Sequence, residues 1–206
     1  NAYEGVYIGK EAGKSANSNY QVFIGTKAGE NANGATRAVA VGWNAGLSAT
    51  GDDFVAVGYR AGRINTATGT ISIGYDAGYS QTSAAANIHI GYEAGYSYTT
   101  GRYNANIGYQ SGKFQTGMNN VFIGATAGLG VSGSSTGGRN IGIGASALTG
   151  LTTGSNNTVL GRAAGTTITT GNNLIAIGSD AQASSASATN EITLGDANIT
   201  LLRIPG

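Results

Sequence analysis

A short tandem repeat along the whole chain limits what this sequence can fold into. Small apolar residues alternate and end in glycine, as in Val6-Tyr7-Ile8-Gly9, and this frame occurs twelve times. The frame ends at Gly9, Gly25, Gly42, Gly58, Gly74, Gly91, Gly108, Gly124, Gly144, Gly161, Gly178 and Gly195. Successive glycines are 16 or 17 residues apart, with one exception of 20. A unit this short cannot hold a helix pair or a propeller blade, and it fits one turn of a β-solenoid.

The repeat predicts one all-β domain over residues 1–206, a parallel β-solenoid of about twelve turns of 16–17 residues. Parallel strands stacked about 4.8 Å apart would give a rod roughly 55–60 Å long. The 20-residue spacing contains a stretch rich in glycine and serine, which predicts an inserted surface loop at about 129–138. Residues 190–206 depart from the repeat and are expected to form a C-terminal end segment.

Composition narrows the function classes. The chain has 36 glycines, only 10% charged residues and a formal net charge of +1. This charge gives no basic footprint for nucleic acid, and no apolar run is long enough for membrane insertion, so neither partner is expected. The chain has no cysteine and lacks the recurring aspartates of calcium-binding repeats. We therefore expect no metal site and no cofactor.

The strand motif predicts an assembly. Alternate side chains of a strand face opposite sides, and we expect Val and Ile of the Val-x-Ile frame to face the interior. The residue between them would then face outward, and it is uncharged in all twelve units. Two positions after the marker glycine, six of twelve residues are charged, which indicates solvent exposure there. Because no segment remains to cover the uncharged face, we expect another copy of the chain to cover it in a parallel homo-oligomer.

Several runs resemble known fibre repeats. The segments NNVFIGATAG, IHIGYEAGYSYTTG and NLIAIGSDAQA are similar to head repeats of trimeric autotransporter adhesins. The longer unit and the ending NEITLGDANITLLRIPG more closely resemble bacteriophage tail fibres. The resemblance implies a left-handed parallel β-roll, three chains side by side, and an extracellular place in a virion tail fibre that attaches to a host surface. The alternative is the head of an adhesin on a bacterial cell surface.

One column of aromatic residues is a candidate binding site. The residue after the marker glycine is aromatic in five successive units: Trp43, Tyr59, Tyr75, Tyr92 and Tyr109. Exposed tyrosine and tryptophan offer contact area to a host glycan or protein. The same column would also suit packing between turns, and the sequence leaves both interpretations open.

The sequence predicts no catalytic residues. A Ser-His-Asp triad needs a histidine, and the only one, His89, lies within a strand motif. Asp76 and Glu93 fall on adjacent turns, as a glycosidase pair might, but Arg60 in the same column favours a row of solvated charges. A carbohydrate-active enzyme and an ice-binding solenoid remain as alternatives, and the second is disfavoured because the threonines cluster at corners.

Overall fold

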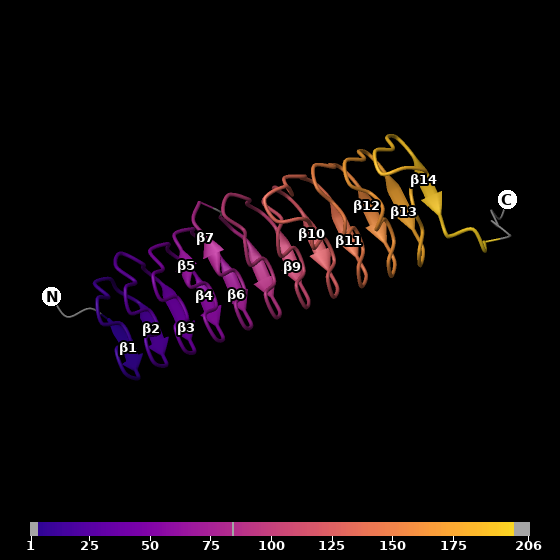
Figure 1. Ribbon diagram of the computed structural model, residues 1–206. Helices are drawn as coiled ribbons and strands as arrows, with labels where there is room; N and C mark the ends of the chain where they lie inside the picture. The colour runs from indigo at the N-terminus through magenta and orange to yellow at the C-terminus, as the bar shows by residue number, and fades with distance from the viewer. Residues whose placement is uncertain (1–3, 84, 200–206) are drawn as a thin grey trace, which may run out of the picture.

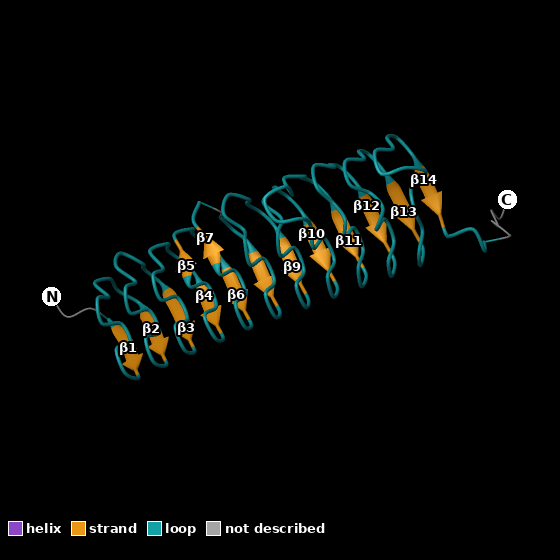
Figure 2. Ribbon diagram, in the orientation of Figure 1, coloured by secondary structure: helices purple, strands orange, loops and turns teal. Residues whose placement is uncertain are grey.

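The computed structural model describes residues 4–83 and 85–199, and they form a rod of stacked parallel strands (Figure 1). The described residues contain strands, turns and loops but no helix (Figure 2). The expected all-β parallel solenoid is therefore confirmed. Twelve strands form one sheet in chain order, which makes eleven repeat steps.

The main sheet uses one strand from each repeat. Its members are β1 (Gly5–Ile8), β2 (Gln21–Ile24), β3 (Ala38–Val41), β4 (Val55–Val57), β6 (Ile71–Ile73), β8 (Ile88–Ile90), β9 (Ala105–Ile107), β10 (Val121–Ile123), β11 (Ile141–Ile143), β12 (Thr158–Leu160), β13 (Ile175–Ile177) and β14 (Ile192–Leu194). A second sheet pairs β5 (Ile64–Asn65) with β7 (Ser80–Gln81). Pairing joins equivalent repeat positions, as in Val22 with Val6 and Val39. Each repeat position therefore becomes a straight column along the rod.

The marker glycines are required by the stacking of turns. From Gly9 to Gly178 they have φ between 127° and 141°, a region that residues with side chains rarely adopt. A Cβ at Gly42 would lie closer than 3.0 Å to the carbonyl of Gly58 on the next turn. The backbone angle and the close approach together exclude other residues at this position.

The expected orientation of the strand face is wrong, because the residue between Val and Ile faces the interior. Phe23, Ala40, Ala56 and Val159 are fully buried, whereas Val6 and Ile8 are 50% and 57% exposed. The roll is narrow, and it fits the central residue against a small Ala-Gly pair on the opposite wall. At Gly29, for example, a Cβ would collide with the ring of Phe23.

The interior has two apolar segments and a polar middle. One apolar core contains Phe23, Phe54 and small alanines up to Ala61, and the other runs from Phe122 to Ala181. Between them the inward column carries Ser72, His89 and Asn106, all buried.

Asparagine side chains replace apolar packing over five successive turns. The column consists of Asn87, Asn104, Asn120, Asn140 and Asn157, and all five side chains are buried. Each Oδ1 accepts a hydrogen bond from the backbone N–H at the same position of the next turn, over 2.8–3.1 Å. Each Nδ2 donates to a carbonyl of the next corner. The column therefore links neighbouring turns and satisfies buried backbone groups.

The insertion is shorter than the loop expected at 129–138. Residues 131–134 are exposed, but Ser135 is buried and pairs with Gln115 in a β-bridge. Of the expected C-terminal segment 190–206, β14 continues the sheet, and residues 200–206 lie outside the described residues.

Candidate functional site

The predicted aromatic column is a continuous stack of rings. Centroids of neighbouring rings are 4.7–5.2 Å apart, and the planes are within 12° of parallel. The stack contains Trp43, Tyr59, Tyr75, Tyr92 and Tyr109, each between 39% and 51% exposed. Because the faces of the inner rings contact one another, the ring edges and tyrosine hydroxyls face solvent. The contact area that these residues offer to a ligand therefore consists of ring edges and hydroxyls, and the inner ring faces are occupied by their neighbours.

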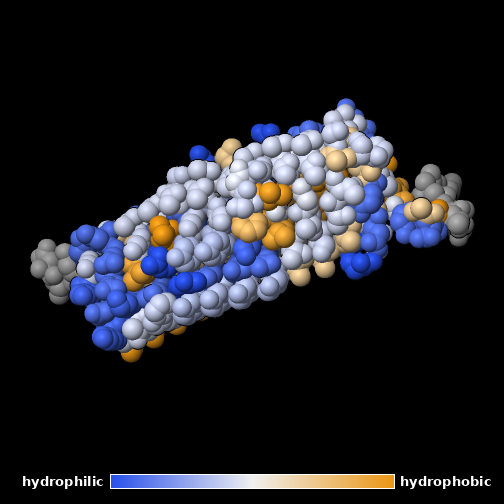
Figure 3. Space-filling model, in the orientation of Figure 1, coloured by the Kyte–Doolittle hydropathy of each residue, from blue (hydrophilic) through white to orange (hydrophobic). Residues whose placement is uncertain are grey.

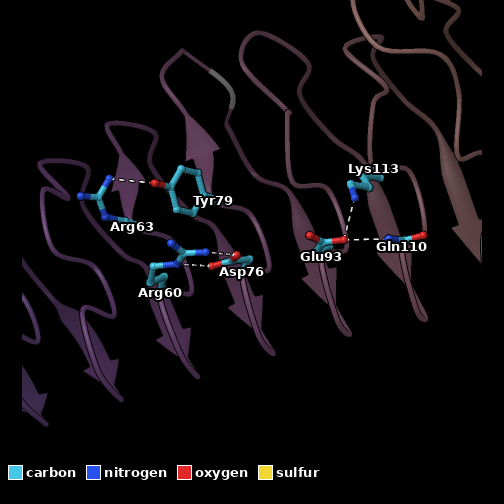
Figure 4. Close-up of polar contacts among 7 residues, drawn as sticks. All are labelled: Arg60, Arg63, Asp76, Tyr79, Glu93, Gln110 and Lys113. Carbon is cyan, nitrogen blue, oxygen red and sulfur yellow. Dashed lines mark hydrogen bonds and ion pairs between the residues drawn. The ribbon is translucent and has the colours of Figure 1, made fainter.

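A charged column runs beside the aromatic stack, and Figure 4 shows its residues Arg60, Asp76 and Glu93. Arg60 donates two hydrogen bonds to Asp76, from Nε over 2.7 Å and from Nη2 over 2.5 Å. The Arg60 guanidinium also lies 5.0 Å from the ring centre of Tyr59 and 5.3 Å from that of Tyr79. The hydrogen bonds to Asp76 raise the pKa of Arg60. These contacts place Asp76 in a bidentate ion pair, where it cannot act as a free catalytic acid.

Glu93, the other carboxylate of the suggested pair, is also engaged. Lys113 Nζ donates to Glu93 Oε2 over 2.6 Å, and Gln110 Nε2 donates to the same oxygen over 2.7 Å (Figure 4). Burial raises the pKa of Glu93, but these hydrogen bonds outweigh it and the net pKa is lowered. Among the described residues, no group of three histidine, cysteine or acidic side chains could hold a metal ion.

His89 lies in the interior and does not face a partner surface. Its side chain is fully buried, and Asn106 Nδ2 donates to its Nδ1 over 2.9 Å. Its Nε2 has no hydrogen-bond partner among the described residues. Burial lowers the pKa of His89 to about 3, so the ring is neutral in the folded protein at ordinary pH.

The outer face of the main sheet carries many exposed aliphatic residues. The outward residues that are most exposed are Val6, Ile8, Ile73, Ile88, Ile123, Ile141, Leu160, Ile175, Ile177, Ile192 and Leu194. They come from β1, β6, β8 and β10 to β14, and the outward residues of β2, β3, β4 and β9 are half-buried. The flank seen in Figure 3 differs from this face, because its hydrophobic residues occur in separate patches among hydrophilic ones.

A threonine column forms one corner of the solenoid. Thr50, Thr66, Thr82, Thr99, Thr116, Thr136, Thr152 and Thr169 occupy one repeat position in eight successive turns. Several hydroxyls donate to a carbonyl one turn away, as from Thr116 to Ser135 over 3.0 Å and from Thr152 to Thr169 over 2.9 Å. Five of the eight hydroxyls make such a bond, those of Thr66, Thr82, Thr116, Thr152 and Thr169, and they link neighbouring turns at this corner. The regular recurrence of threonine at one repeat position in the sequence could have predicted this column.

The chain has no match among family models, curated proteins or solved structures. No helix long and apolar enough to cross a bilayer occurs in the described residues.

Proposed function

We propose that the chain is a structural and adhesive segment of a phage tail fibre, a rigid rod that assembles as a parallel homotrimer and helps to attach the virion to its host. The proposal includes the left-handed roll and the extracellular location that the sequence resemblance implies. It includes no enzymatic role. The alternative is the head of a bacterial trimeric adhesin.

The observation that carries the proposal is the exposed apolar face of the main sheet. The described outward positions of its twelve strands carry valine, isoleucine and leucine, with Ala105 and Thr158 as the small or polar exceptions. An apolar surface this long is unusual on a monomeric soluble protein and marks an interaction surface.

A second copy of the chain is the partner that fits this face best. The face repeats at every turn, so a parallel copy in register presents an aliphatic side chain at each rung. The face is also uncharged, and its burial therefore requires no compensating charge on the partner. In a homotrimer, the outer sheet face of each chain would pack against both other chains. The corners of the solenoid would stay accessible to a host surface.

Assembly is tested by measuring mass in solution. Sedimentation equilibrium should give about three times the chain mass of 20.5 kDa. The double variant Ile73→Asp with Ile177→Asp places two charges on the outward face, 37% and 40% exposed, and should dissociate the assembly.

The matched control is Val131→Asp, because Val131 is also an exposed aliphatic residue but lies in the inserted loop. It should keep the mass of the unaltered protein. A stable, folded species of 20.5 kDa for the unaltered protein would refute the proposed assembly.

Attachment is tested separately with the assembled rod. Purified rod should compete with the intact virus for adsorption to host cells. The coding sequence around this segment distinguishes the two proposals: tail genes and a self-cleaving chaperone support a phage fibre, and a membrane-anchor barrel supports a bacterial adhesin.

A further inference from the structure

A groove with both polar and apolar walls lies on the corner that leads into β10, β11 and β12. Its volume is about 430 Å³, and its wall includes Thr100, Met118, Asn119, Thr136, Arg139 and Ser155. The groove lies outside the apolar face proposed for assembly, and outside the aromatic stack.

The charge around this groove is not balanced. Residues 94–179 contain no aspartate or glutamate but contain Arg102, Lys113, Arg139 and Arg162. Lys113 pairs with Glu93 and Arg162 pairs with Asp180, so both find carboxylates just beyond this stretch. Arg102 and Arg139 have no carboxylate partner among the described residues.

The repeat supplies an internal comparison for Arg139. Arg37 occupies the same position relative to its marker glycine, and its φ of 53° is close to the 58° of Arg139. Asp53, one turn further, accepts two hydrogen bonds from Arg37, from Nε over 2.5 Å and from Nη2 over 2.9 Å. The corresponding residue after Arg139 is Asn156, which also has a left-handed φ of 59°. Arg139 therefore has the same repeat position and backbone conformation as Arg37, but the next turn offers it no carboxylate.

From this geometry we infer that the groove binds an anionic glycan through Arg139. A guanidinium matches the two oxygens of a carboxylate or phosphate. The side chains of Thr100, Asn119 and Thr136 make no hydrogen bond to other described residues, and they can serve sugar hydroxyls. Met118, which is 47% exposed, supplies apolar contact for a sugar ring.

The inference deepens the proposed attachment function and rests on it for its biological setting. The ligand is defined by its chemistry, a sugar that carries a carboxylate or a phosphate. A neutral glycan would leave Arg139 without a counter-charge.

Binding is tested with three soluble probes on the assembled protein: a hexasaccharide containing glucuronic acid, a phosphorylated core oligosaccharide of lipopolysaccharide, and a neutral glucan of similar length. One or both anionic probes should bind, and the neutral one should bind at least about tenfold more weakly, since a charge-assisted hydrogen bond is worth roughly 1.5–3 kcal/mol. The probe that binds identifies the anionic group.

Two variants and a matched control locate the site. Arg139→Gln removes the cation, and Asn156→Asp supplies the missing carboxylate while Arg139 is kept. Each should weaken anionic binding by roughly tenfold or more. Arg37→Gln makes the same charge change at the same repeat position away from the groove, and it should leave binding unchanged.

The mass of each sample is measured in parallel, so that failed assembly is distinguished from failed binding. Equal affinity for neutral and anionic probes, no binding at millimolar concentration by an assembled rod, or full binding by Arg139→Gln would each overturn the inference.

Discussion

At the scale of single residues, the polar middle of the interior concentrates unsatisfied groups. Gln81 Oε1, His89 Nε2, Tyr98 Oη and Asn106 Oδ1 are buried and lack hydrogen-bond partners among the described residues. Burial raises the pKa of Tyr98 above its ordinary value, as it lowers that of His89. A buried polar atom without a partner costs free energy, so these turns depend on the surrounding ladder for their stability.

His89 should make stability depend on pH. Its pKa is about 3 in the folded protein and about 6.5 when unfolded. As pH falls below 6.5, His89 becomes protonated in the unfolded chain but stays neutral in the folded chain. The free energy of unfolding therefore declines until about pH 3, where the folded chain is protonated too. The maximum slope for this one group is about 1.4 kcal/mol per pH unit. Chemical denaturation between pH 4 and pH 8 measures this dependence.

The control is His89→Asn, because Asn106 occupies the same position in the next turn. The variant should lose the His89 part of the pH dependence. If the two proteins show the same acid profile, the buried neutral histidine is not its source.

At the scale of elements, the turn after each main-sheet strand decides which columns form. From Gly9 to Gly178, each marker glycine is followed two positions later by a residue with left-handed φ, so the intervening residue lies in the same local turn each time. Aromatic residues at that position must therefore stack, because the pairing of strands holds neighbouring turns about 4.8 Å apart. Stacked pairs of aromatic rings contribute roughly 0.5–1.5 kcal/mol each beyond their buried area.

Replacing Tyr75 and Tyr92 with serine should therefore destabilise the rod. The double variant removes three stacking contacts, and we expect a loss of roughly 2–4 kcal/mol, seen as a lower denaturation midpoint. Tyr20→Ser with Tyr103→Ser is the matched control, since these tyrosines are exposed and lie outside the stack.

The variant Tyr75→Phe with Tyr92→Phe keeps the stack and removes two hydroxyls. Unchanged stability with lost adsorption to host cells would assign the hydroxyl row to binding. Unchanged adsorption by this variant would limit the column to packing.

At the scale of the whole molecule, a narrow roll with an apolar outer face has too little interior to bury its aliphatic residues alone. Its two apolar cores are small and are separated by the polar middle. Packing of the outer faces would supply the larger apolar burial, and the stability of the rod would then depend on association.

Thermal stability should accordingly rise with protein concentration. Mass action favours the assembled folded state, so the melting temperature should increase over a hundredfold range of concentration. The variant Ile73→Asp with Ile177→Asp should lose this dependence. A melting temperature of the unaltered protein that is independent of concentration, with reversible unfolding, would contradict assembly through the sheet face.

The sequence by itself determined the fold class, the repeat step and the columns, because a strict period transfers each repeat position to the next turn. It also located the aromatic column and the alignment of Arg60 with Asp76, but the solvated row of charges expected there was wrong, because Asp76 is buried in an ion pair. Tertiary structure alone decided which strand face is inside, since alternation separates two faces without saying which one is enclosed. The interior of the roll is narrow and accommodates mainly small and planar side chains. These side chains therefore face inward, and most Val and Ile residues of the strands face outward. It also revealed the groove at Arg139, because a groove depends on how corners of neighbouring turns stack, and no residue pattern along the chain records that.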